Sequence, residues 1–142
     1  MNLDVMFSPK STAVFGSASP GKLANVLVHR LMEGGMETIY AVNPKGLGVE
    51  AVPGYTSILE IEGPVDLAVI AAPAKTVAGI MEECGQKGVK AAIIISSGFS
   101  EAGNAAGEKE VMAIAGKYGI RCVGPNCAGL INTHGNLVAT LE

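Results

Sequence analysis

The chain has 142 residues, the usual length of one globular domain. Its composition, 49% hydrophobic and 16% charged residues, excludes a disordered protein. A net charge of −3 gives no general attraction for nucleic acid, and no apolar run reaches the roughly 18 residues that a membrane helix needs. The three cysteines show no metal-ligand spacing and no secretion signal is visible, so we expect reduced thiols in a cytoplasmic protein.

Short apolar runs alternate with segments of helical periodicity along the chain. An approach segment (1–10) precedes the first strand, and residues 141–142 resemble the start of a cloning tail. Strands are predicted at residues 11–15, 37–42, 65–71, 89–96 and 120–123, and helices at 21–33, 75–87 and 104–118. Weaker signals predict short strands at 49–52 and 130–131 and a short helix at 57–61. The alternation predicts an α/β fold over residues 1–142, a single Rossmann-like domain with a doubly wound, mostly parallel sheet.

Two of the predicted helices carry apolar stripes that we expect to face the core. The stripes consist of Leu23, Val26, Leu27 and Leu31 in the first helix, and Val77, Ile80, Met81 and Cys84 in the second. We expect Cys122, in the last of the five main strands, to be a core residue as well.

The segments that follow the five main strands share an unusual composition. They read GSASPGK, NPKG, APA, SSGF and GPNCAG, all rich in small residues, proline, polar groups or a cation. Because the carboxyl ends of parallel strands meet at one edge of the sheet, where ligands bind in such folds, we expect the site there.

The first of these segments, residues 16–22, has the order of an anion-binding turn: strand, small residues, helix start. It matches the G-x-x-x-x-G-K pattern of a P-loop, but Leu23 stands where that motif needs the Ser or Thr hydroxyl that binds Mg²⁺. Asp66 lies at the start of its strand, the wrong edge for a metal ligand. Nucleotide hydrolysis by this loop is therefore disfavoured.

A dinucleotide site is a second alternative. The loop is not G-x-G-x-x-G, and Asn43-Pro44-Lys45 stands after the second strand, where an acid would hold the ribose hydroxyls. A cation at this place suits a ribose that carries a phosphate. Both NADP and coenzyme A (CoA) have such a ribose, so these residues alone leave the two ligands open.

Five segments in order, AVFGSASPGK, YAVNPKG, VDLAVIAAPA, KAAIIISSGFSEAG and YGIRCVGPNCAGLIN, extend a resemblance from about residue 7 to 136. They resemble the CoA-binding domain of NDP-forming acyl-CoA synthetases, which include ADP-forming acetyl-CoA synthetases. The same domain opens the α subunit of succinyl-CoA synthetase. The GPNC-x-G block and the NPK turn are the most specific segments. The first loop departs from the GFTGSQG of succinyl-CoA synthetase, and Ser97 stands where that enzyme has an acid.

The resemblance implies CoA as the ligand and a position for each part of it. The first loop would receive the CoA phosphates, Lys45 would pair with a phosphate, and the Ala72-Pro73 segment would lie against the adenine. The third loop would lie near the pantetheine, and the turn at Asn126 near the thiol end. The candidate CoA-binding residues are Gly16, Ser17, Ala18, Ser19, Pro20, Gly21, Lys22, Asn43, Pro44, Lys45, Ala72, Pro73, Ser96, Ser97, Gly98, Asn126 and Cys127.

The family makes acyl-CoA from a carboxylate, CoA and a nucleoside triphosphate, using a phosphohistidine domain and an ATP-grasp module. Neither module is recognisable here, so we expect a CoA-binding chain that is not catalytic alone. It would be part of a longer acid–thiol ligase or a stand-alone CoA-binding protein. The alternative from another class is a redox or regulatory module that binds NADP or another nucleotide.

Other chemistry-bearing residues favour structural roles. Cys127 and His134 are seven residues apart, and nothing in the sequence shows that they meet, so a small residue in a tight turn is the simpler interpretation of Cys127. Neither His29 nor His134 has metal partners at useful spacing. Glu101 and Glu108 are expected to be exposed cap or first-turn acids. We therefore predict no metal site and no catalytic residue.

Overall fold

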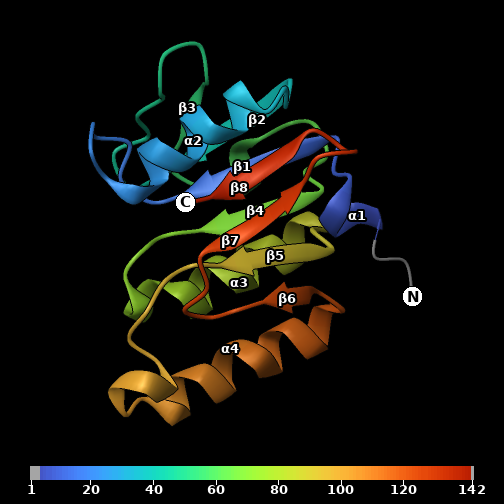
Figure 1. Ribbon diagram of the computed structural model, residues 1–142. Coiled ribbons are helices and arrows are strands. Elements are labelled where there is room, and N and C mark those ends of the chain that lie inside the picture. The colour runs from blue at the N-terminus through green and yellow to red at the C-terminus, as the bar shows by residue number, and fades with distance from the viewer. Residues whose placement is uncertain (1–3, 142) are drawn as a thin grey trace.

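The computed structural model describes residues 4–141, so the outermost residues of the predicted approach segment and tail lie outside the described part. Its centre is a six-stranded parallel sheet in the order β3-β2-β1-β4-β5-β6 (Figure 1). The strands are β1 (Ser11–Phe15), β2 (Thr38–Val42), β3 (Gly54–Tyr55), β4 (Leu67–Ile70), β5 (Ala91–Ile94) and β6 (Arg121–Val123). The predicted doubly wound α/β fold is confirmed.

Helices cover the sheet and connect its strands. The α-helices are α1 (Asp4–Phe7), α2 (Leu23–Glu33), α3 (Ala74–Lys87) and α4 (Ala105–Tyr118), and the 3₁₀ turns are η1 (Ile58–Glu60) and η2 (Ser100–Ala102). α3 and α4 end at Gly88 and Gly119, both left-handed, which is the usual C-terminal stop of a helix. Among the described residues, no helix is long and apolar enough to cross a membrane.

The two faces of the sheet carry separate cores. One core joins the sheet to α3 and α4 through residues such as Val77, Met81 and Val111. The other joins it to α2 and to an antiparallel hairpin, β7 (Gly129–Asn132) and β8 (Leu137–Thr140). The hairpin lies across this face of the sheet and packs against α2 (Figure 1).

Several local predictions were wrong. Residues 49–52 form a tight turn closed by an isolated bridge, and the edge strand is β3. The predicted short strand at 130–131 is confirmed as part of β7, but the sequence analysis missed its hairpin partner β8. Leu23 is 48% exposed because it begins α2 at the solvent-facing edge, although Leu27 and Leu31 are buried as expected. Cys122 is only partly buried because β6 is an edge strand.

The strand order reverses between β1 and β4. From β1 the chain proceeds outward to β2 and β3, and from β4 it proceeds the other way to β5 and β6. At such a switch point the loops after the two adjacent strands diverge and leave a crevice for a ligand. The segments concerned are the one beginning at Gly16 and the one at Ala71–Pro73.

Candidate functional site

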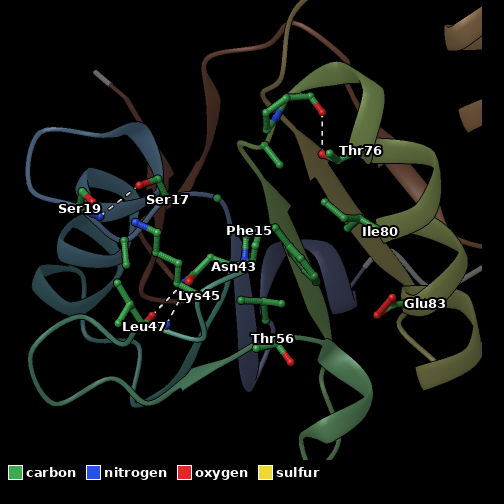
Figure 2. A pocket seen from close by; sticks show the side chains of 16 residues that line it. Phe15, Ser17, Ser19, Asn43, Lys45, Leu47, Thr56, Thr76, Ile80 and Glu83 are labelled. Carbon is green, nitrogen blue, oxygen red and sulfur yellow. Dashed lines mark hydrogen bonds between the residues drawn. The ribbon is translucent and has the colours of Figure 1, made fainter.

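A cavity of about 410 Å³ lies at this switch point (Figure 2). Its wall includes nine of the candidate residues, drawn from the segments after β1, β2 and β4: Gly16, Ser17, Ala18, Ser19, Asn43, Pro44, Lys45, Ala72 and Pro73. The sequence analysis missed the rest of the wall, namely Phe15, Val42, Leu47, Thr56, Thr76, Ile80 and Glu83.

Gly16 allows the first loop to leave the sheet beside β4. Its φ of +144° is one that residues with a side chain rarely adopt. A Cβ atom at this position would lie 2.7 Å from the carbonyl oxygen of Ala71 and 2.9 Å from the Cβ of Ala24 in α2. The close approach of β1, β4 and α2 at the cavity therefore depends on glycine.

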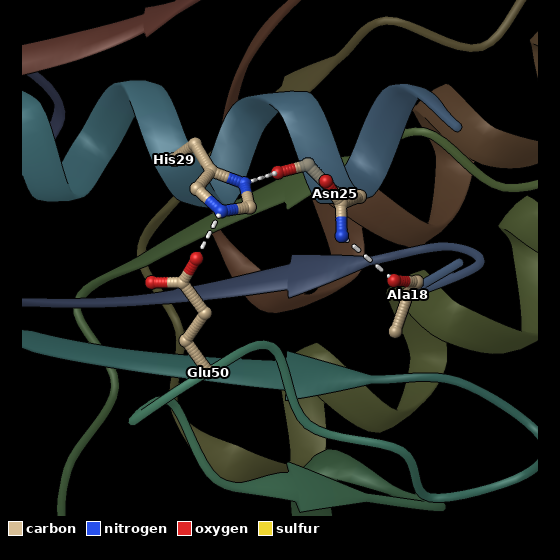
Figure 3. Close-up of polar contacts among 4 residues, drawn as sticks. All are labelled: Ala18, Asn25, His29 and Glu50. Carbon is tan, nitrogen blue, oxygen red and sulfur yellow. Dashed lines mark hydrogen bonds and ion pairs between the residues drawn. The ribbon is translucent and has the colours of Figure 1, made fainter. Parts of the chain in front are cut away.

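The loop between β1 and α2 is held by side chains of the loop and of the helix. The Ser19 amide donates to Ser17 Oγ at 3.3 Å, and the Lys22 amide donates to the Ser19 carbonyl at 3.1 Å. From α2, Asn25 Nδ2 donates to the Ala18 carbonyl at 2.8 Å (Figure 3). Ser17, Ser19, Pro20 and Gly21 remain exposed, so the loop presents small groups to solvent.

Two helices begin at this edge without a side-chain cap. Lys22 precedes α2 and Pro73 precedes α3, and neither makes a side-chain capping hydrogen bond. By contrast, Asn104 caps α4 and Ser57 caps η1. An uncapped N-terminus offers N–H groups and the positive end of the helix dipole to an anion. The beginnings of α2 and α3 can therefore both receive negative charge.

The segment after β2 supplies a cation on a rigid loop. Buried Asn43 donates from Nδ2 to the Leu47 carbonyl at 2.8 Å and accepts from the Leu47 amide at 3.0 Å. Both polar atoms of the Asn43 side chain are therefore hydrogen-bonded within the loop. Asn43 fixes the shape of the loop, on which Lys45 is exposed. In Figure 2 the Lys45 side chain lies on the same side of the cavity as Ser17 and Ser19.

A second anchor holds the far end of this loop to α2. His29 Nε2 lies 2.9 Å from Glu50 Oε1, and His29 Nδ1 lies 2.9 Å from the Asn25 carbonyl (Figure 3). These two hydrogen bonds raise the pKa of His29 above 6.5, and the bond to Glu50 contributes more than the bond to Asn25. Through Asn25 and His29, α2 therefore contacts both loops that border the cavity.

The remaining candidates lie along the same edge, outside the cavity wall. Ser96 Oγ donates to the Ala72 carbonyl at 2.5 Å, and the Asn126 amide donates to the Ser96 carbonyl at 3.0 Å. These bonds connect the ends of β4, β5 and β6 in order. Pro20, Gly21, Lys22, Ser97, Gly98 and Cys127 also lie outside the wall.

Cys127 is placed by its turn. Its Sγ lies 3.3 Å from the Ile94 carbonyl, and partial burial raises the pKa of the thiol. A thiol in this state is a poor nucleophile at neutral pH. Burial raises the pKa of Cys122 to about 11 and that of Cys84 further. No cluster of three or more metal-ligating side chains occurs among residues 4–141.

The missed wall residues had one usable signal. Thr76, Ile80 and Glu83 follow one another at spacings of four and three, so they share a face of α3 that begins at Pro73. The sequence analysis assigned Ile80 to the core stripe; it is half-buried and lines the cavity. Thr56 and Leu47 had no such signal, because irregular backbone brings them to the wall.

A parallel α/β sheet with a cavity, two uncapped helix starts and a cation at its switch point defines a Rossmann-like nucleotide-binding domain. Comparison with known proteins narrows this class. Residues 10–133 match the family described as the CoA binding domain, and the chain therefore belongs to that family.

Similar sequences and a similar solved structure support the same family. The chain is 48% identical over 149 residues to the alpha subunit of ADP-forming acetate–CoA ligase I of Pyrococcus furiosus, covering 99% of this chain and 32% of the relative. It is 45% identical over 133 residues to an ADP-forming acetate–CoA ligase of Methanocaldococcus jannaschii, covering 93% of this chain and 19% of the relative. An acetyl-coenzyme A synthetase structure from Ca. Korarchaeum cryptofilum superposes with a TM-score of 0.92 at 34% identity, over 98% of this chain and 30% of that one. The chain thus spans a fifth to a third of these relatives.

Proposed function

We propose that this chain binds CoA along the carboxyl edge of its sheet, as the CoA-binding part of an NDP-forming acyl-CoA synthetase. One observation carries the proposal. The cavity at the switch point combines small exposed loop groups, two uncapped helix N-termini and the exposed Lys45. Membership of the CoA-binding-domain family supports CoA as the nucleotide that fits this combination.

The diphosphate occupies the loop from Gly16 to Gly21. Exposed Ser17 and Ser19 allow a close approach, and the N–H groups at the start of α2 donate hydrogen bonds to the phosphate oxygens. Lys22, at the N-cap position, adds a cation at this place. Leu23 follows Lys22, at the position where a P-loop has the Ser or Thr hydroxyl that binds Mg²⁺, which agrees with CoA and not with a nucleoside triphosphate–metal complex.

The 3′-phosphate of the ribose pairs with Lys45. The bonds of Asn43 to Leu47 hold this loop in a fixed shape, so the ammonium group is presented toward the cavity from a rigid base. A charge-assisted hydrogen bond to a phosphate is about twice as strong as a neutral one. Pro44, beside it on the cavity wall, shapes the turn.

The base lies against Ala72 and Pro73, and the pantetheine arm extends along the strand ends. It passes Ser96, Ser97 and Gly98 and reaches Asn126 and Cys127 near the thiol. The hydrogen bonds from Asn126 to Ser96 and from Ser96 to Ala72 support this path, because they make the three strand ends one continuous surface.

In this proposal the chain is a single CoA-binding domain over residues 1–142 that supplies no catalytic residue. ATP-grasp and phosphohistidine domains, on the same or a partner chain in the cytoplasm, carry out nucleotide cleavage and acyl transfer. The relatives named as CoA ligases of acetate and 4-hydroxybutyrate point to a carboxylic acid as substrate.

Calorimetric titration of the purified chain with CoA, NADPH and ATP tests the proposal. We expect CoA to bind with one-to-one stoichiometry, and NADPH and Mg–ATP to bind at least about tenfold more weakly. Binding of NADPH without binding of CoA would replace the proposal with an NADP-dependent regulatory module.

A further inference from the structure

The cavity has two chemically different ends (Figure 2). Lys45 and the loop of Ser17 and Ser19 form one end. The other end is formed by α3, whose Ile80 and Glu83 side chains lie across the cavity from that loop. When charged phosphates occupy the first end, the α3 end is left for the flat, less polar part of a nucleotide.

The hydroxyl groups at the α3 end are already used within the protein. Thr76 Oγ1 donates to the Pro73 carbonyl at 2.7 Å, and Thr56 Oγ1 donates to the Glu60 carboxylate. A hydroxyl has a single proton to donate. Neither threonine therefore has a donor left for a ligand in this arrangement.

Glu83 supplies the carboxylate acceptor at this end of the cavity. Its Oε1 accepts a hydrogen bond from Ser57 Oγ, and Ser57 is the only described residue for which a hydrogen bond to this carboxylate occurs. The same Ser57 oxygen accepts from the Leu59 amide at 3.1 Å, which fixes the direction of its proton toward Glu83. An ionised carboxylate accepts hydrogen bonds and donates none. This end of the cavity is thus built to receive a donor from the ligand.

We propose that Glu83 recognises the exocyclic amino group of adenine and makes the site select 6-aminopurine over 6-oxopurine nucleotides. The inference rests on the proposed function, because it takes the nucleotide to be CoA with its phosphates at the Lys45 end. The amino group of adenine donates to Glu83 Oε2. A 6-oxo group at the same place would bring one oxygen acceptor against another, and both would lose water without gaining a partner.

The test compares CoA with its hypoxanthine counterpart, in which oxygen replaces the 6-amino group and the rest of the molecule is unchanged. Calorimetry on the wild-type chain should show CoA binding about 10-fold or more tightly than the counterpart. In Glu83→Gln the ratio should fall to about twofold or less, because an amide can offer an N–H to the oxo group as readily as a C=O to the amino group.

Glu82→Gln is the matched control. Glu82 precedes Glu83 in α3, but its carboxylate faces α4, where it accepts from Lys117 Nζ at 3.0 Å and from Tyr118 Oη at 2.5 Å. The preference for the adenine base should therefore be the same in Glu82→Gln as in the wild type.

The outcomes separate the two proposals. If neither nucleotide binds the wild-type chain, the proposed function fails. If CoA binds but the wild-type ratio is near one, or if Glu83→Gln keeps the wild-type ratio, the role of Glu83 is overturned and CoA binding stands. Should Glu83→Gln fail to fold by circular dichroism, the wild-type ratio and the ratio of Glu83→Asp, whose shorter side chain withdraws the carboxylate, decide in its place.

Discussion

Asn25 holds the loop that precedes its own helix. Its Nδ2 donates to the Ala18 carbonyl at 2.8 Å, seven residues earlier, and so fixes the turn between β1 and α2. The proposed diphosphate position depends on this turn, because the shape of the loop determines how closely a phosphate can approach the uncapped N–H groups of α2.

Replacing Asn25 should therefore weaken CoA binding. In Asn25→Ala we expect about a fivefold to tenfold loss of CoA affinity, since one neutral hydrogen bond contributes about 1 kcal/mol. Asn132→Ala is the control, because Asn132 Nδ2 donates to the Phe7 carbonyl at 2.6 Å and lies outside the cavity wall. Equal affinities of the two variants, measured by calorimetry, would contradict the positioning role of Asn25.

Gly16 and Gly79 form a pair of glycine positions with opposite expected effects. Gly16→Ala should lower the free energy of unfolding by about 2 kcal/mol or more and abolish CoA binding, because the new Cβ would meet Ala71 and Ala24 at a strained φ. Gly79 lies within α3 with nothing within 4 Å of its ideal Cβ. Gly79→Ala should raise stability by about 0.5–1 kcal/mol. Chemical denaturation measures both, and a Gly16→Ala protein of wild-type stability would contradict the structure.

The His29–Glu50 pair gives the protein a pH dependence of known sign. Because the pKa of His29 is raised above 6.5 in the folded chain, the pair's contribution to stability is complete below about pH 6.5. The contribution is then lost as pH rises through the folded-state pKa. The pair is solvent-exposed, so we expect a small effect.

NMR titration of the His29 ring tests this dependence. In Glu50→Gln the pKa of His29 should move down toward its ordinary value, since the hydrogen bond that the ring donates to Glu50 is the largest cause of the shift. Glu33→Gln should lower it less, because Glu33 acts only through a minor charge–charge interaction. A His29 pKa that is indifferent to Glu50→Gln would rule out the ion pair in solution.

The thiols report on the proposed pantetheine path. Cys127 should react with iodoacetamide faster than Cys122 or Cys84, because it is the least buried of the three and burial holds the pKa of Cys122 at about 11. Bound CoA should slow the alkylation of Cys127 and leave that of Cys122 unchanged. Mass spectrometry of each cysteine peptide measures the rates, and a Cys127 rate indifferent to CoA would exclude the proposed position of the thiol end.

Most of the fold follows from local sequence patterns. The doubly buried runs at β4 and β5 and the helical periodicities gave the parallel sheet, because both signals are local. The second strand of the hairpin, β8, was missed because Leu137–Thr140 is short and its burial against α2 depends on contacts distant in sequence. Leu23 fits the apolar spacing but begins the helix, where the stripe has already turned away from the sheet.

The candidate site could likewise be predicted in part from the sequence. Composition at the strand ends located the edge, and the family resemblance named the nine candidates that line the cavity, including Gly16 and Lys45. Glu83 and Thr56 could not be assigned, because their place depends on how α3 and the 3₁₀ turn at Ile58–Glu60 pack together. A helix face is visible in a sequence, but which cavity it borders is set by tertiary packing.

The most direct test of the account is a cycle that combines Lys45→Ala with removal of the ligand's 3′-phosphate. Affinities for CoA and dephospho-CoA are measured by calorimetry on the wild-type chain and on the variant. We expect Lys45→Ala to weaken CoA binding by about tenfold or more and dephospho-CoA binding by less than about twofold, because the lost contact is one charge-assisted bond to that phosphate. Equal losses for the two ligands would show that Lys45 does not contact the 3′-phosphate and would contradict the proposed orientation of CoA in the site.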